Sequence, residues 1–185
     1  MLDIDGLITR NREYAERYHK PIPEFAKFEG VPPSIVIFTC IDFRISATKF
    51  LQIKPEGEYV FIIRNAGGRV RSGFSDLVFM ETFTQGKLLK EIMIIHHTDC
   101  GCAHITDEKL KESLLEKAPG NPDMVNAMYF GAFGSNKSLE EIVLEDISFL
   151  KEYPLLRKEV RNAVRGFIFD IYSGLVTEKE NGIST

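Results

Sequence analysis

The 185-residue chain has only three cysteines, no tryptophan and no excess of basic residues. Its 23 lysines and arginines stand against 27 acidic residues, so a basic face is not expected and nucleic acid is not predicted as a partner. No apolar run approaches the roughly 20 residues that a membrane-spanning helix needs, so no membrane association is expected. The first residues have neither the basic nor the apolar segment of a signal peptide, which favours a cytoplasmic protein.

Three cysteines do not make a disulfide framework, and without an export signal they are better interpreted as metal ligands or free thiols. Cys40 follows the apolar run Ile35–Phe38, while Cys100 and Cys102 follow a second run, Ile92–Ile95. Short apolar runs of this kind are typical of buried strands in a parallel sheet. Open α/β sheets bind their ligands beyond the carboxyl ends of such strands, where these cysteines lie.

The alternation of apolar runs with helical patterns predicts an α/β fold. We expect a mostly parallel central sheet of four strands, an antiparallel edge strand, and helices on both faces. The expected strands are Ser34–Cys40, Tyr59–Ile63, Glu91–His96, Val164–Tyr172 and, at the edge, Leu175–Thr177. Helices are expected at residues 9–19, 46–51, 73–89 with Ser72 as N-cap, from Thr106, from the capping-box residue Ser138, and at 154–161.

One catalytic domain is sufficient for this pattern. It is expected to span residues 31–177, after an N-terminal helical arm at 1–30 and before a loose polar tail at 178–185. Tyr14 and Tyr18 give the arm an apolar character that must rest on its own domain or on a partner subunit.

A histidine and a cysteine with the spacing His-x-x-Cys, His97 and Cys100, can bind one zinc ion together. If the two buried strands are neighbours, Cys40 reaches the same edge and supplies a third ligand, which leaves a fourth position open as in catalytic zinc sites. His96 alternates with His97, so only one of them can comfortably point at the metal, and the other is expected to be packed or hydrogen-bonded. Cys102 is an alternative to Cys100, but its Cys-x-Cys spacing is a less common zinc pattern.

Asp42 and Arg44 follow Cys40 in the same strand-end turn. A bidentate pair between them would orient Asp42 as a hydrogen-bond acceptor for an attacking hydroxide and would keep its carboxylate off the metal. The glycine-containing loop at residues 64–70 lacks the spacing of a nucleotide-binding fingerprint. Its expected role is close approach of the backbone behind the metal site.

Three segments of the chain together resemble the successive signatures of the β-class carbonic anhydrases. They are Cys40–Arg44, Arg64–Gly68 and His96–Gly101, and residues 165–175 resemble the last core strand and turn of that family. The resemblance covers about residues 30–177. The paired histidines and Gly68 resemble a sub-branch that also includes carbonyl sulfide and carbon disulfide hydrolases.

The resemblance implies a zinc ion held by Cys40, His97 and Cys100, and a catalytic dyad of Asp42 and Arg44. It also implies supporting roles for three glycines: Gly67 and Gly68 in the loop, and Gly101, whose N–H would face a ligand sulfur. A homodimer or a multiple of dimers is implied, with the N-terminal arm embracing the partner subunit.

The activity implied by the resemblance is the reversible hydration of carbon dioxide to bicarbonate. Hydrolysis of carbonyl sulfide or carbon disulfide is the alternative, and a catalytically silent, zinc-stabilised scaffold is a lesser one. Phe43 stands where the family usually has serine or alanine. An aromatic ring beside the dyad is therefore a candidate for the substrate pocket, where it would narrow the pocket or make it more apolar.

Overall fold

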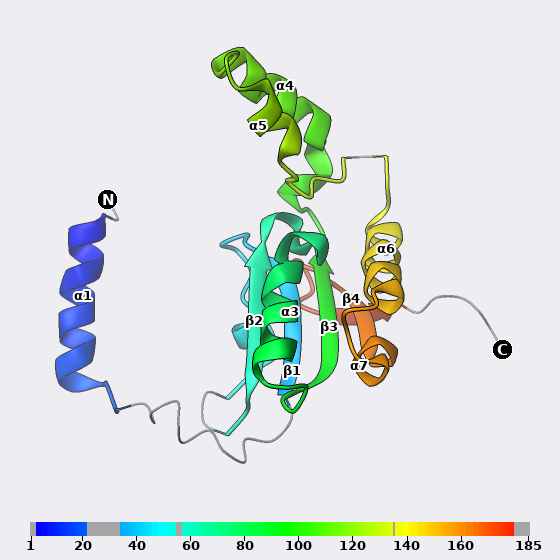
Figure 1. The fold of residues 1–185 in the computed structure, drawn as a ribbon. Helices are drawn as coiled ribbons and strands as arrows, with labels where there is room; N and C mark the ends of the chain where they lie inside the picture. The colour runs from blue at the N-terminus through cyan, green and yellow to red at the C-terminus, as the bar shows by residue number, and fades with distance from the viewer. Residues whose placement is uncertain (1–2, 22–33, 55–56, 135, 180–185) are drawn as a thin grey trace. The chain divides into compact units, whose positions relative to one another are not determined.

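The computed structural model describes residues 3–21, 34–54, 57–134 and 136–179 (Figure 1). The chain divides into two compact units, Met1–Val31 and Pro32–Thr185. The first contains helix α1 (Ile4–Arg17), which has no buried residue. The helix predicted at 9–19 begins earlier, at Ile4, because the carboxylate of Asp3 accepts a hydrogen bond from the N–H of Gly6 and caps the helix there. It also ends earlier than predicted, at Arg17. Most of the arm that follows lies outside the described residues.

The second unit is built on a five-stranded sheet in the order β2-β1-β3-β4-β5 (Figure 1). Its parallel strands are β1 (Ser34–Cys40), β2 (Val60–Asn65), β3 (Leu89–His97) and β4 (Val164–Phe169). Strand β5 (Val176–Lys179) pairs antiparallel with β4 at the edge. The predicted fold class is thereby confirmed, including the neighbouring positions of β1 and β3.

The end of β4 differs from the prediction. The strand stops at Phe169 and not at Tyr172, because the carboxylate of Asp170 accepts hydrogen bonds from the N–H groups of Tyr172 and Ser173. A side chain that binds the backbone ahead of it favours a turn over a continuing strand. Strand β5 then extends to Lys179, so the first two residues of the predicted loose tail belong to the sheet, and the remainder lies outside the described residues.

The helix after β2 is also shorter than predicted. Helix α3 (Phe74–Phe83) follows a 3₁₀ turn at Arg71–Gly73, so Ser72 is not its N-cap. It ends where Gln85 and Gly86 take positive φ angles of 52° and 70°, and the Gly86 N–H bonds back to the carbonyl of Glu81. The other helices are α2 (Ala47–Phe50), α4 (Asp107–Lys117), α5 (Pro122–Ala127), α6 (Leu139–Glu152) and α7 (Lys158–Asn162), with 3₁₀ turns at Ala66–Gly68 and Gly101–His104.

Helix α6 begins with the predicted capping box, in which Ser138 and Glu141 each accept from the other's backbone N–H. Helices α3, α6 and α7 pack on one face of the sheet, against the buried residues Val36, Ile92, Ile94 and Val164. On the other face, Phe50 of α2 stacks on Phe169 with ring centroids 4.1 Å apart. In the described ranges of the chain, no helix is both long and apolar enough to cross a membrane.

Candidate metal centre

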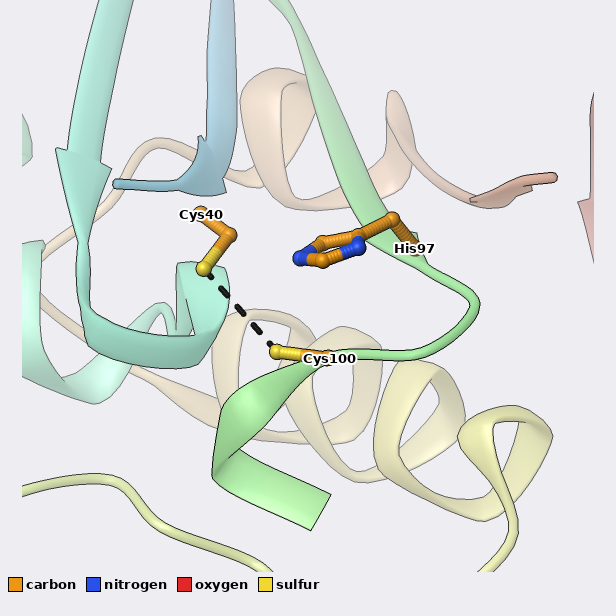
Figure 2. A group of neighbouring side chains, drawn as sticks. All are labelled: Cys40, His97 and Cys100. Carbon is orange, nitrogen blue, oxygen red and sulfur yellow. Dashed lines mark hydrogen bonds between the residues drawn. The ribbon is translucent and has the colours of Figure 1, made fainter. Parts of the chain in front are cut away.

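Strands β1 and β3 end side by side because they are parallel neighbours in the sheet. Their register places Thr39 opposite Ile95, so Cys40 at the end of β1 lies beside the end of β3, where His97 is the last residue. A short turn after His97 brings Cys100 back toward the same point (Figure 2). The three side chains therefore come from two strand ends and one turn.

The side chains of Cys40, His97 and Cys100 point toward one another in a buried cluster (Figure 2). Their potential ligand atoms all lie within 4.8 Å of one another, and the two sulfurs are 3.9 Å apart. Two sulfurs bound to one tetrahedral zinc ion at about 2.3 Å each would be separated by roughly 3.8 Å. The observed spacing of the sulfurs therefore suits one zinc ion between them.

The two adjacent histidines have different surroundings because successive strand residues face opposite sides of a sheet. The Nδ1 of His97 lies 2.9 Å from the carbonyl of Thr98, which fixes this nitrogen as the donor. Its Nε2 is buried and has no hydrogen-bond partner, as expected for a nitrogen that offers its lone pair to a metal. His96 instead places Nδ1 2.8 Å from the carbonyl of Gly67 and Nε2 3.0 Å from Asp146, so it is hydrogen-bonded away from the cluster, as predicted.

The acidity of the two thiols also bears on metal binding. Contact with Cys100, together with burial, raises the pKa of Cys40 to about 12. Contact with Cys102, together with burial, raises the pKa of Cys100 to about 11. At neutral pH, a cation that binds here must displace both thiol protons, so its affinity rises with pH. The orphaned imidazole nitrogen, the sulfur spacing and the two thiols together fit zinc.

Asp42 and Arg44 form the bidentate pair that the sequence predicts. The Nε of Arg44 lies 3.0 and 3.1 Å from the two carboxylate oxygens of Asp42, and Nη2 lies 2.6 Å from Oδ2. These hydrogen bonds lower the pKa of Asp42 to about 2. The Oδ2 atom is also 3.9 Å from the Nε2 of His97. An ionised carboxylate thus borders the metal cluster while the guanidinium holds it.

The turn after β2 packs directly behind Cys40. Gly68 has a φ of +70°, and a Cβ added there would lie 2.9 Å from the backbone nitrogen of Cys40. Only glycine suits this combination of left-handed backbone and close approach, so Gly68 lets the turn pack against the backbone of Cys40. An added Cβ at Gly101 would meet no atom within 4 Å, and the predicted contact of its N–H with a ligand sulfur stays a prediction.

Two further arginine contacts were not predicted from the sequence. Arg64 donates to the carbonyls of Cys40, Asp42 and Ile45 at 3.0, 2.8 and 3.2 Å, which fixes the path of the loop after β1. Arg44 also donates to Asp99, as described below. Spacing gave no signal for either contact, because both depend on how the loops fold back.

The remaining candidates lie at the margin of the site. Cys102 is half-buried and outside the converging group, so it remains a nearby free thiol. His19 and His104 are exposed. Phe43 is 95% exposed in the single chain, and its place in a substrate pocket stays a prediction. It lies on the surface next to the dyad.

Comparison with known proteins agrees with this geometry. The family model for carbonic anhydrase matches residues 35–176. The chain belongs to the β-carbonic anhydrase family. "Beta-carbonic anhydrase 1" of Mycobacterium tuberculosis is 31% identical over 178 residues, which cover 94% of this chain and 96% of the relative.

The chain is also similar to a carbon disulfide hydrolase and to a carbonic anhydrase of known structure. "Carbon disulfide hydrolase" of Acidianus sp. (strain A1-3) is 26% identical over 185 residues, which cover 91% of this chain and 84% of the relative. The crystal structure of a carbonic anhydrase from Streptococcus mutans superimposes with a TM-score of 0.74 at 30% identity, and the match covers 97% of this chain and 99% of that one.

Proposed function

We propose that the chain is a zinc enzyme that adds hydroxide to carbon dioxide and forms bicarbonate. Cys40, His97 and Cys100 would hold one zinc ion per chain. When bound, zinc lowers the pKa of a water molecule to near neutrality and polarises the substrate oxygen. The observation that carries the proposal is the ionised carboxylate of Asp42, clamped by Arg44 at the border of the cluster.

Asp42 would act by orienting the attacking water. Its carboxylate is ionised at neutral pH, so it would accept a hydrogen bond from the attacking oxygen and aim a lone pair of that oxygen at the carbon. Arg44 occupies the carboxylate with a bidentate pair and thereby keeps it from ligating the metal. A purely structural zinc site would not need either residue, which argues against a silent scaffold.

The test is carbon dioxide hydration by the zinc-loaded protein, followed by stopped flow with a pH indicator. Asp42→Asn is expected to keep one zinc ion per chain and to lose roughly 10²-fold in kcat, because the reacting atoms lose their orientation. Asp76→Asn, an exposed carboxylate on α3, serves as the matched control and should retain the wild-type rate. A wild-type rate in Asp42→Asn would refute the role of Asp42.

The ligand set has its own test in zinc content, measured by elemental analysis after dialysis. Cys40→Ser is expected to lose the metal, because it removes one of two thiolates. The matched control is Cys102→Ser, which changes a nearby thiol outside the converging group and should keep one zinc per chain. Full occupancy in Cys40→Ser, or loss in Cys102→Ser, would mean that the ligands are wrongly assigned.

Hydrolysis of carbonyl sulfide or carbon disulfide is the second candidate. It is favoured by Phe43, an exposed apolar ring next to the dyad, and by the carbon disulfide hydrolase among the relatives. The same attacking water would convert carbonyl sulfide and water to carbon dioxide and hydrogen sulfide. Parallel assays with carbon dioxide, carbonyl sulfide and carbon disulfide distinguish the candidates, with sulfide release as the second readout. If Phe43 sets the preference, Phe43→Ser raises the ratio of hydration to sulfide release.

Assembly as a homodimer or a multiple of dimers is proposed on the same footing, with α1 (Ile4–Arg17) contributing to the contact. Its exposed apolar side chains support this role: Ile4, Leu7, Ile8, Tyr14 and Tyr18. Sedimentation of the full chain tests the proposal.

A further inference from the structure

We propose that Asp99 is a positioning residue that holds the guanidinium of Arg44 and, through it, the carboxylate of Asp42. Asp99 lies in the turn between His97 and Cys100. This inference rests on the proposed function, because it assigns Asp99 a part in aligning the attacking water.

Arg44 is held from two directions. Its Nε and Nη2 face Asp42, as described above. On the other side, Nη1 donates to the Oδ2 of Asp99 at 2.7 Å, and Nη2 donates to the backbone carbonyl of Asp99 at 2.8 Å. The carboxylate and the backbone carbonyl of Asp99 therefore accept hydrogen bonds from the side of the guanidinium that does not face Asp42. Two separate anchors fix the plane of the guanidinium, whereas one anchor would let the pair swing as a unit.

The second anchor joins the two loops that carry the metal ligands. Asp42 and Arg44 follow Cys40 on the β1 loop, whereas Asp99 precedes Cys100 on the β3 loop. The Asp99–Arg44 contact therefore ties the position of the dyad to the loop that supplies the other two ligands. His104 comes near the remaining carboxylate oxygen of Asp99, with its Nε2 4.0 Å away.

The backbone conformation of Asp99 is one that an aspartate tolerates. Its φ is +54°, in the left-handed region that aspartate and asparagine tolerate better than most residues. The carboxylate is 43% exposed and Arg44 is 40% exposed. Ion pairs this exposed add little to stability, so the contribution of the contact is the geometry that it imposes on Asp42.

Two substitutions separate the carboxylate from the backbone. Asp99→Gly keeps the left-handed conformation and removes the side chain, whereas Asp99→Asn keeps an oxygen acceptor in the same place and removes the charge. Both are compared with Glu178→Gln, which weakens another partly exposed carboxylate–arginine pair, with Arg165, at distances of 2.7 and 2.5 Å. All are measured as the zinc-loaded full chain.

We expect zinc content to stay at one per chain in each variant. The kcat for the substrate that the wild type turns over should fall about tenfold in Asp99→Gly with KM little changed, because orientation is lost and substrate binding is not. Asp99→Asn should recover part of this loss, and Glu178→Gln should match the wild type. A merely structural role would lower zinc content or the active fraction and would not give a selective loss of kcat with rescue by asparagine.

A second readout follows Arg44 itself and does not depend on turnover. Nitrogen-15 NMR reports rotation of the guanidinium groups, and the Arg44 signals are assigned by their absence in Arg44→Lys. Slow rotation in the wild type and faster rotation in Asp99→Gly support the clamp. Unchanged Arg44 signals in Asp99→Gly would overturn it, as would a wild-type kcat in that variant. If the wild type proves inactive on every substrate tested, the proposed function fails, but the NMR comparison still decides whether Asp99 positions Arg44.

Discussion

Removal of the buried carboxylate of Asp146 should destabilise the protein strongly. Asp146 lies on α6 with only 1% of its surface exposed. It is 3.0 Å from the Nε2 of His96, and it is 3.2 Å from the Nε of Arg69 in an ion pair that lacks hydrogen-bond geometry. Asp146→Ala leaves the Nε2 of His96 facing a cavity without an acceptor and removes the buried carboxylate beside the Nε of Arg69. The carbonyl of Gly67, which His96 also binds, then loses a fixed partner.

The magnitude follows from the cost of breaking a buried ion pair by deleting one partner, which is about 3–5 kcal/mol. In a domain of this size, each kcal/mol shifts Tm by roughly 2–4 °C. The expected fall in Tm is therefore roughly 6–20 °C. Arg69 also has Glu145 at 3.2 Å, which offsets part of the lost interaction and favours the lower half of this range.

Thermal unfolding is best followed by circular dichroism, because the chain has no tryptophan. Wild type and variant are compared zinc-loaded, at equal protein and zinc concentrations, since bound metal and assembly both shift Tm. Glu152→Ala, an exposed carboxylate on the same helix, serves as the control and should change the free energy of unfolding by less than about 0.5 kcal/mol. If Asp146→Ala unfolds within a degree or two of the control, the carboxylate is not what compensates the buried His96 and Arg69.

Two further predictions concern the loops at the metal centre. Gly68→Ala should lower zinc affinity and Tm more than Gly57→Ala, because both glycines have positive φ but only the Cβ at 68 would strike the backbone, 2.9 Å from the nitrogen of Cys40; equal effects in zinc titration and thermal unfolding would refute this. The pKa of Asp42 lies at about 2 in the folded state against the usual 3.8. The pair with Arg44 therefore contributes stability above about pH 4 and loses it as the pH falls toward 2, so the difference in Tm between wild type and Asp42→Asn should shrink over that interval; a constant difference would contradict the assigned pair.

The convergence of the metal cluster could be predicted from the sequence because it depends on topology. Two apolar runs that end in candidate ligands bring those ligands together whenever the runs are neighbouring parallel strands. The choice of His97 over His96 likewise follows from alternation along a strand, although the direction of each ring had to come from the structure. The capping box of α6 could also be predicted from the sequence, since it is a local pattern.

The predicted ends of elements were wrong where a side-chain hydrogen bond or a positive φ angle decides locally whether a helix or strand continues. The pattern of α3 continues past Phe83, but Gln85 turns left-handed, and apolar periodicity does not report φ. At the end of β4, Asp170 competes for the backbone, and apolar alternation hides that competition. Asp146 did leave a signal, because it is a charged residue within the apolar stripe of α6 formed by Ile142, Val143, Ile147 and Leu150. Such a residue is buried only with partners, and His96 and Arg69 are those partners.

Two hydrogen-bond networks surround the cluster of Cys40, His97 and Cys100, one buried and one exposed. On the buried side, His96 and Asp146 fix the Gly67–Gly68 turn against the backbone of Cys40. On the exposed side, Arg44 fixes Asp42. Because Arg44 keeps the pKa of Asp42 at about 2, Asp42 does not change its charge near neutrality. If turnover of the proposed enzyme varies with pH between about 5 and 9, the proposal assigns that dependence to a zinc-activated water, because Asp42 keeps its charge over this range. Asp42→Asn removes a negative charge beside the cluster, so it should lower the plateau of the pH–rate profile and move its midpoint to lower pH.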